Sequence, residues 1–235
     1  MLLESFGGPV RGLGSKTSTT DPVTDADREA ERAIRELLGA ERPDDGVLGE
    51  EGSRQAGDSG RRWVVDPLDG TVNFLYGIPQ WCVSVALEEG EAALVGVVLD
   101  PVRDELFAAE RGGGARLNGE PIRVREQAQL ERALVATGFS YERERRVEQA
   151  EVVGRLLPRV RDIRRAGSAA LDLSWLAAGR LDGFYERGLK PWDWRAGGLL
   201  VEEAGGALAE LPGEPWGLVA ANPALLGSLA ELALT

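Results

Sequence analysis

The most constraining feature of the sequence is the segment 63–71, which reads Trp-Val-Val-Asp-Pro-Leu-Asp-Gly-Thr. Its apolar start, residues 63–65, predicts a short strand that runs directly into Asp66, and the proline that follows predicts a tight turn. Two carboxylates three residues apart, Asp66 and Asp69, stand with the Leu68 carbonyl between them. This is a set of oxygen ligands suited to a hard divalent cation.

The end of this segment adds features of an anion site. Gly70 permits close approach of the backbone to a ligand, and the free amides of a helix beginning near Thr71 would hold a phosphate oxygen. The alternative is that Pro-x-Asp-Gly is only a common turn string, which is how we interpret the Leu-Asp-Gly triplet at Leu181–Gly183. The segment alone therefore leaves a metal site and a plain turn both open.

Composition limits the chemistry further. The chain has no histidine and a single cysteine, Cys82. Ser-His-Asp and Cys-His catalysis, His-ligated haem or zinc, and an internal disulfide are therefore excluded. Any metal chemistry must use oxygen ligands, which points to Mg²⁺, Ca²⁺ or Mn²⁺. The formal net charge of −12 argues against direct nucleic-acid binding, although bound cations can reverse the local field for a small anionic substrate.

The first half of the chain predicts one helix followed by strands. Thr24 and Asp27 have the form of a capping box and apolar residues at helical spacing follow, so we predict a helix from about Thr24 to Leu38. The strands predicted after it are Trp63–Val65, Cys82–Leu87, Ala92–Leu99 and Glu105–Ala109. The dipeptide Asn118-Gly119 predicts a two-residue hairpin turn.

From about residue 130 onward, strand and helix patterns alternate. The predicted strands are Leu134–Thr137, Gly183–Glu186 and Leu218–Ala221, and the predicted helices are Glu142–Leu157, Ser168–Ala178, Arg195–Ala204 and Pro223–Leu232. We therefore expect an α+β half over residues 1–130 joined to an α/β half over residues 131–235.

Acidic residues also stand beside turns or helix starts at three other places, and each has an ordinary structural interpretation. Asp27 is explained as the reciprocal residue of the capping box. Glu50 and Glu51 are explained as a solvated loop pair, and Asp193 as the N-cap of the helix predicted at Arg195. Taken one at a time, these interpretations are favoured over catalysis.

The joint pattern resembles the inositol monophosphatase family of Mg²⁺-dependent, lithium-sensitive sugar phosphatases. The matching strings are Asp21–Asp27, Leu48–Glu51, Trp63–Phe74, Gly96–Pro101, Gly167–Leu171, Gly188–Asp193 and Glu203–Gly206. They cover nearly the whole chain in the family's order, and the string that ends at Asn73 is the most specific. The resemblance implies the layered αβαβα sugar-phosphatase fold.

The resemblance also implies roles for individual residues. The first metal site would be Glu50, Asp66 and the Leu68 carbonyl; the second Asp66, Asp69 and Asp193; a third, weaker metal would be held through Glu50 and water. Asp27 would orient the Thr71 hydroxyl, which polarises the attacking water. The substrate contacts would be Gly70, Thr71 and Lys16 at the phosphate, and Asp69, Gly167, Ser168, Ala169, Glu186 and Asp193 at the polyol.

We therefore expect hydrolysis of myo-inositol monophosphate with two or three Mg²⁺ ions. Two cations about 3.5–4 Å apart activate water and neutralise the leaving alkoxide of an otherwise very slow reaction. Fructose 1,6-bisphosphate, histidinol phosphate and phosphoadenosine nucleotides are alternative substrates, among which Glu186 favours inositol phosphate. The segment 167–206 also looks like the bacterial relative that joins the ribosomal-RNA antitermination complex. Thr71 together with Asp27 speaks against an inactive metal-binding scaffold.

Partners and location follow by analogy or from what the sequence lacks. The first residues do not read as a secretory signal and no apolar stretch is long enough to span a bilayer, so we expect a cytoplasmic protein without membrane contact. Relatives are commonly homodimers, and we expect the same here. Relatives also begin with a longer N-terminal helix, so residues 1–6 suggest a shortened start.

Overall fold

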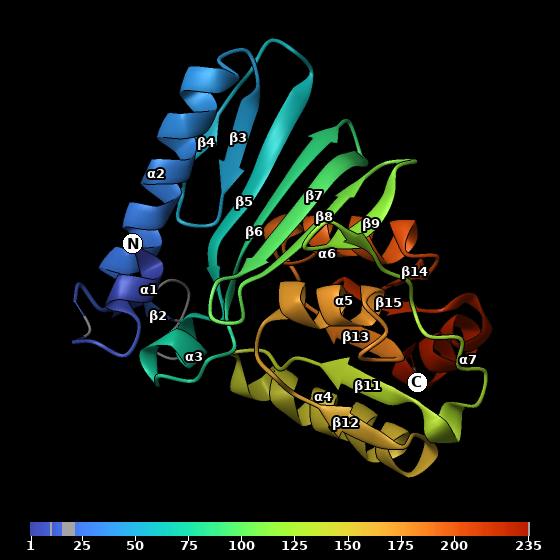
Figure 1. The fold of residues 1–235 in the computed structure, drawn as a ribbon. Coiled ribbons are helices and arrows are strands. Elements are labelled where there is room, and N and C mark those ends of the chain that lie inside the picture. Colours follow the sequence, from blue (N-terminus) through green and yellow to red (C-terminus); the bar gives the residue numbers. More distant parts are fainter. Residues whose placement is uncertain (10, 16–21, 235) are drawn as a thin grey trace.

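The computed structural model describes residues 1–9, 11–15 and 22–234. Helices and sheets alternate in five layers (Figure 1). The order is helix α2 (Asp25–Glu41), a large sheet, the pair α5 (Ala169–Ala177) and α6 (Pro191–Glu203), a smaller sheet, and the pair α4 (Arg143–Leu156) and α7 (Pro223–Leu234). The expected αβαβα layering is confirmed.

The large sheet is formed by the first part of the chain. In spatial order its strands in the described residues are β10 (Glu120–Pro121), β9 (Gly114–Leu117), β8 (Glu105–Glu110), β7 (Ala92–Asp100), β6 (Cys82–Glu89), β5 (Arg61–Asp69), β3 (Gly46–Gly49) and β4 (Arg54–Gln55). Neighbours are antiparallel except for β3 and β5, which run parallel. Because β3 and β5 point the same way, the residues that follow them meet at one end of the sheet.

The smaller sheet is mixed. Its order is β12 (Asp162–Arg164), β11 (Leu134–Thr137), β13 (Gly183–Arg187), β15 (Gly217–Ala221) and β14 (Ala207–Leu211). The first three strands are parallel, so their carboxyl ends share one edge, while β15 is antiparallel to both of its neighbours.

The main core lies between the two sheets and is filled by α5 and α6. Phe107 of β8 and Phe184 of β13 are both fully buried in it, on opposite sides of the helix layer. Gly197 lets α6 lie close against α5, because a β-carbon there would come within 2.6 Å of the Leu173 side chain. A second core, which includes Leu225 and Leu229 of α7, covers the other face of the smaller sheet. The division of the chain into two halves at residue 130 stays a prediction. The main core contains side chains from both halves.

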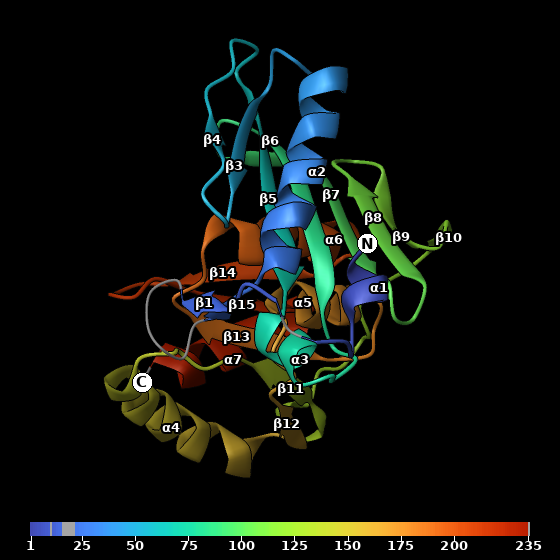
Figure 2. The same ribbon diagram turned by 90° about the vertical axis from the view of Figure 1, so that its left-hand side faces the viewer.

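Short elements lie around the N-terminal end of α2. Figure 2 shows α1 (Leu2–Ser5), β1 (Gly14–Ser15) and α3 (Thr71–Leu75) in this region, and β2 (Pro22–Val23) is labelled in Figure 1. Phe6, Phe74 and Trp81 pack with ring centroids 5.1–5.6 Å apart and join α1 to α3. No helix in the described ranges is both long and apolar enough to cross a bilayer.

Most of the predicted elements are confirmed, with shifted ends. The capping box at Thr24 is present, and Asn118-Gly119 forms the two-residue turn between β9 and β10. Two expectations are wrong. The helix predicted at Arg195 begins four residues earlier, at Pro191, and the predicted tight turn at Asp66 is a bulged continuation of β5 that extends to Asp69.

Strands β1, β2, β3, β4, β9, β10, β12 and β14 were not predicted. They are short, and pairing with neighbouring strands stabilises them. Strand β14 shows the effect of pairing, since the segment 207–211 reads Ala-Leu-Ala-Glu-Leu and pairs along its whole length with β15.

Candidate active site

Asp66 lies in β5 opposite Ser84 of β6 and is 1% exposed. Its Oδ1 accepts a hydrogen bond from the amide of Leu68 at 3.0 Å. This local bond closes the bulge in β5 and fixes the carboxylate. The sequence Asp-Pro-Leu-Asp therefore places Asp66 and Asp69 at the end of a buried strand.

Glu50 comes to the same place from the neighbouring parallel strand. Its amide donates to the carbonyl of Val65 at 3.1 Å, so it lies beside the residue before Asp66. The turn that follows is fixed by Glu31 of α2, a buried side chain that accepts from the amides of Glu51 (2.7 Å) and Ser53 (3.0 Å). The 50–51 pair is thus part of an ordered turn, and the Glu31 contact was not predicted.

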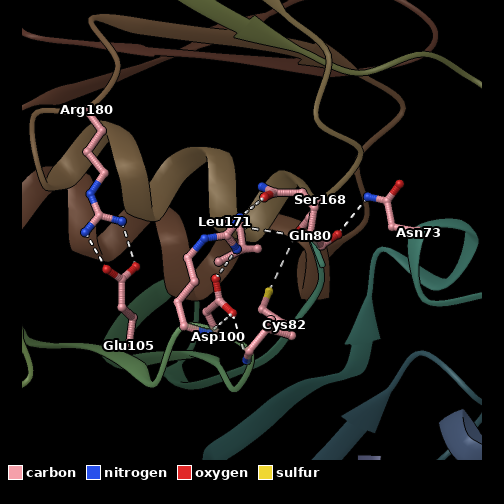
Figure 3. Close-up of polar contacts among 10 residues, drawn as sticks. Asn73, Gln80, Cys82, Asp100, Glu105, Ser168, Leu171 and Arg180 are labelled. Atoms are coloured by element: carbon pink, nitrogen blue, oxygen red, sulfur yellow. Dashed lines mark hydrogen bonds and ion pairs between the residues drawn. The ribbon is translucent and has the colours of Figure 1, made fainter. Parts of the chain in front are cut away.

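Asp69 lies at the N-terminus of α5. One of its oxygens accepts hydrogen bonds from the hydroxyl of Ser168 (2.7 Å) and from the amide of Ala170 (2.8 Å). Ser168 is the N-cap of α5, and its hydroxyl also lies 3.5 Å from the buried thiol of Cys82 (Figure 3). A carboxylate at a helix N-terminus is stabilised by the free amides and by the helix dipole.

Asp27 and Thr71 meet where two other helices begin. Asp27 is fully buried in the first turn of α2, and one of its oxygens accepts from the amide of Thr24 at 2.8 Å. Its other oxygen accepts from the hydroxyl of Thr71, the first residue of α3, at 3.0 Å. The Thr71 hydroxyl is also 3.1 Å from the carbonyl of Leu68. Asp27 therefore caps α2 and contacts Thr71 at the same time, because one oxygen accepts from the Thr24 amide and the other from the Thr71 hydroxyl.

Asp193 lies in the first turn of α6. Its carboxylate accepts from the amide of Lys190 at 2.6 Å, which places it at the third position of the helix, where it caps backwards. The expectation that Asp193 is itself the N-cap is wrong. The hydroxyl of Ser84 donates to the carbonyl of Trp192 at 3.2 Å and ties this turn to β6 beside Asp66.

The acidic side chains affect one another's charge. Burial raises the pKa of Asp66 well above its ordinary value, and the nearby charges of Glu50, Asp69 and Asp193 raise it further. Burial also raises the pKa of Asp193, again with help from Glu50 and Asp69. Four acids brought together from separate segments thus form one field of like charge, which a cation would relieve.

The four acids do not yet form a closed metal cage. Within the described residues, no group of three His, Cys, Asp or Glu side chains already has the arrangement of a metal site. Each carboxylate of the pair Asp69 and Asp193 has one oxygen engaged by backbone amides, and ligation would use the remaining oxygens. The type of donor fits a hard divalent cation, and side-chain rotation would complete the geometry.

A wall of the site is built at the carboxyl ends of the parallel strands of the smaller sheet. Glu186 of β13 lies so close to Gly138 that a β-carbon on that glycine would come within 2.1 Å of its carboxylate. Burial, then the charges of Asp172 and Asp69, raise the pKa of Glu186 to about 8, while Arg165 opposes the rise.

Gly167 and Ala169 flank the N-cap of α5. Asn73 of α3 connects this turn to the Thr71 side of the site, since its amide nitrogen donates to the carbonyl of Gln80 at 2.7 Å (Figure 3) and to that of Ala166 at 2.8 Å. Arg165 and the buried Asp172 near Glu186 were not predicted. Position next to the Gly167–Leu171 string was the only available signal. Lys16 lies outside the described residues.

The model of the inositol monophosphatase family matches residues 2–234. The chain belongs to this family. It is 46% identical to an inositol-1-monophosphatase of Rhizobium meliloti, over 98% of this chain and 90% of that protein. It is 48% identical to the Nus factor SuhB of Xylella fastidiosa, over 83% of this chain and 71% of that one.

Solved structures agree with this assignment to the inositol monophosphatase family. The crystal structure of extragenic suppressor protein SuhB from Bartonella henselae superposes with a TM-score of 0.92 at 39% identity and covers 99% of this chain and 92% of that one. An IMPase of Thermotoga maritima superposes with a TM-score of 0.89 at 34% identity, over 99% of this chain and 90% of that one. The recognition from sequence motifs is confirmed, and so is the fold.

Proposed function

We propose that this family member is a Mg²⁺-dependent phosphomonoesterase whose substrate is a myo-inositol monophosphate. The observation that carries the proposal is the meeting of the Asp27–Thr71 hydrogen bond with the field of four acids around Asp66. A hydroxyl held by a buried carboxylate and a cluster of acids that raise one another's pKa serve no evident structural purpose together, but both are suited to the attack of water on a phosphate.

Glu50, Asp66 and the carbonyl of Leu68 would hold one cation, and Asp66, Asp69 and Asp193 a second. A third, weaker one would be held through Glu50 and water. Bound there, divalent cations neutralise the phosphate and the leaving alkoxide and lower the pKa of a water molecule. The oxygen-only donor set and the like charges on the carboxylates support Mg²⁺ as the physiological ion.

Thr71 and Asp27 form a hydrogen-bonded pair that would accept a hydrogen bond from the attacking water. The Thr71 hydroxyl donates to Asp27, so its oxygen lone pairs are directed away from that carboxylate and are free to accept from water. Asp27 is held in turn by the amide of Thr24. The pair thereby orients and polarises the water without needing histidine.

The substrate would lie between the helix N-termini and the Glu186 wall. The amides of Gly70 and Thr71 would receive the phosphate oxygens, with Lys16 adding positive charge. The polyol would contact Asp69, Gly167, Ser168, Ala169, Glu186 and Asp193. An acidic residue on the polyol side, Glu186, supports a substrate rich in hydroxyl groups over a nucleotide.

Phosphate release from a panel of inositol, fructose, histidinol and adenosine phosphates, with Mg²⁺ and with EDTA, tests the proposal. We expect Mg²⁺-dependent release with the highest kcat/KM for myo-inositol 1-phosphate. Equal rates on all four classes would refute the substrate, and release that persists in EDTA would refute the metal-dependent mechanism.

Relatives named Nus factor SuhB, at 39–48% identity, favour a second candidate function in transcription antitermination. Such a role would need a protein partner rather than the acidic site. Asp66→Asn would then abolish phosphate release and leave partner binding intact. Loss of both functions in Asp66→Asn with an unchanged melting temperature would contradict their separation.

By analogy with relatives, we also propose a cytoplasmic homodimer whose activity is inhibited by lithium. Sedimentation at micromolar concentration and phosphate release in the presence of LiCl test the two features separately. A monomeric enzyme would refute the proposed dimer, and activity unchanged by LiCl would refute lithium inhibition. Neither result would contradict the proposed active site.

A further inference from the structure

Arg165 lies at the edge of the smaller sheet to which the three parallel strands point. It follows β12 directly, and the pairing of β12, β11 and β13 sets it level with Thr137 and Tyr185. The next residues of the two neighbouring strands are Gly138 and Glu186. Ligands of open α/β sheets bind in the crevice outside the carboxyl ends of such strands.

The turn that carries Arg165 is held from both sides. On one side Asn73 of α3 donates to the carbonyl of Ala166, the next residue, at 2.8 Å. On the other side Ser168 donates to Asp69 at 2.7 Å. The guanidinium packs over the turn, because a β-carbon on Gly167 would come within 2.8 Å of its Nη1. Arg165 is therefore positioned between the Thr71 helix and the Glu186 wall.

Arg165 has few partners for a group with five hydrogen-bond donors. In the described part of the chain its guanidinium forms no hydrogen bond or ion pair, and the guanidinium carbon lies 5.9 Å from the centre of the Phe139 ring. Its exposed guanidinium nevertheless lies in an acidic surrounding, since its charge acts on Glu186 and on the buried Asp172. The donors are thus held near the site without being used within the protein.

Asp172 shows the same feature from the acceptor side. It is 2% exposed in α5, and its Oδ1 has no hydrogen-bond partner among the described residues. A buried carboxylate oxygen without a donor is costly, and a donor group of a ligand or a water would relieve that cost. The charge of Arg165 acts on Asp172, so donors without an acceptor and an acceptor without a donor both lie near Glu186.

We propose that Arg165 is a specificity-determining residue, whose guanidinium donates to the hydroxyl oxygens of the polyol while Glu186 accepts from the hydroxyl protons. This inference rests on the proposed function and states that Arg165 and Glu186 recognise the polyol part of the substrate. Hydroxyl groups are both donors and acceptors, so a polyol satisfies both residues. A plain aromatic or alkyl leaving group satisfies neither.

The test compares a polyol substrate with one that has no hydroxyl groups. kcat/KM is measured for myo-inositol 1-phosphate and for 4-nitrophenyl phosphate with the wild type, Arg165→Gln and Arg165→Lys. For Arg165→Gln we expect KM for the inositol substrate to rise about tenfold, with kcat within about twofold, and no change for 4-nitrophenyl phosphate. Arg165→Lys restores part of the loss.

Arg164→Gln is the matched control. It removes the same charge one residue earlier, but its side chain is exposed and already bound to Asp162 at 2.6 Å. We expect Arg164→Gln to leave kcat/KM unchanged for both substrates. If Arg165 had a purely structural or general electrostatic role, Arg165→Gln would lower kcat/KM equally for both substrates, and that result would overturn the proposal. An unchanged kcat/KM for both substrates would also overturn it.

Calorimetric titration with myo-inositol 1-phosphate in Ca²⁺ gives a readout without turnover. We expect the affinity of Arg165→Gln to fall about tenfold relative to the wild type and to Arg164→Gln. Equal affinities would overturn the role of Arg165. A wild type that releases phosphate from neither substrate would refute the proposed function, and the titration would still decide on Arg165.

Discussion

Mg²⁺ should stabilise the folded protein, and Asp66→Asn should remove that effect. In the absence of metal, the buried Asp66 is surrounded by the charges of Glu50, Asp69 and Asp193, which oppose one another. A ligand that binds only the folded state at about 100 times its Kd stabilises it by about 2.7 kcal/mol. For a chain of this size each kcal/mol corresponds to about 2–4 °C, so we expect a rise in Tm of about 5–10 °C.

Differential scanning fluorimetry in 10 mM Mg²⁺ and in EDTA measures the shift. Asp66→Asn removes one like charge, so its metal-free Tm should equal or exceed that of the wild type, while its Mg²⁺ shift should fall below about 2 °C. Asp44→Asn is the control, since it makes the same change in an exposed turn beyond the other end of α2, about 25 Å away along the helix axis. A wild-type Tm unmoved by Mg²⁺ and EDTA would refute the reasoning, and so would an equal shift in Asp66→Asn.

Three further predictions follow from single contacts. Thr71→Ala loses the hydroxyl that donates to Asp27, so kcat should fall about 10²–10⁴-fold with little change in Tm. Gly138→Ala must displace the carboxylate of Glu186, since its β-carbon would lie within 2.1 Å of it, so KM for the polyol substrate should rise with kcat nearly kept. The pKa of Glu186 is raised by burial, Asp172 and Asp69 against the opposing Arg165. Its contribution to stability is therefore complete below its ordinary pKa of 4.5 and is lost as pH rises toward about 8.

Each of these has a control and a contradicting result. Thr71→Ser keeps the hydroxyl and should retain activity within about tenfold, whereas equal loss in both variants would deny the proton role. Gly39→Ala, where nothing lies within 4 Å, should leave KM unchanged; a Gly138→Ala KM equal to that of the wild type would contradict the wall. Urea unfolding at several pH values between 5 and 8 without metal should show the wild type losing stability relative to Glu186→Gln, by at most about 1.4 kcal/mol per pH unit. Parallel curves would contradict the burial of that charge.

The long elements could be predicted because their patterns are strong. The strand Leu134–Thr137 has the predicted bounds, and the capping box at Thr24 sets the start of α2 within one residue. The start of α6 was misplaced because Asp193 was interpreted as an N-cap, although a proline two residues earlier is typical of a first helical position. β12 and β14 depend on pairing with partners distant in sequence, which local patterns do not contain.

The site was predictable to the extent that its residues lie in motifs. Asp27 and Thr71 are 44 positions apart, and only the resemblance suggested that they meet, as their 3.0 Å contact shows. Glu31 accepts hydrogen bonds from backbone amides, and Arg165 is placed by the register of β12 against β11. Neither kind of contact produces a recognisable sequence motif. The metal-ligand roles of the acids stay predictions.

Anomalous diffraction from crystals grown with Mn²⁺ tests the central claim most directly, because Mn²⁺ takes the same oxygen ligands as Mg²⁺. We expect anomalous peaks within about 2.5 Å of carboxylate oxygens of Asp66, Glu50, Asp69 and Asp193, and their loss in Asp66→Asn. Ordered Mn²⁺ bound elsewhere in an enzyme that is active with Mn²⁺, with these four carboxylates free of metal, would contradict it.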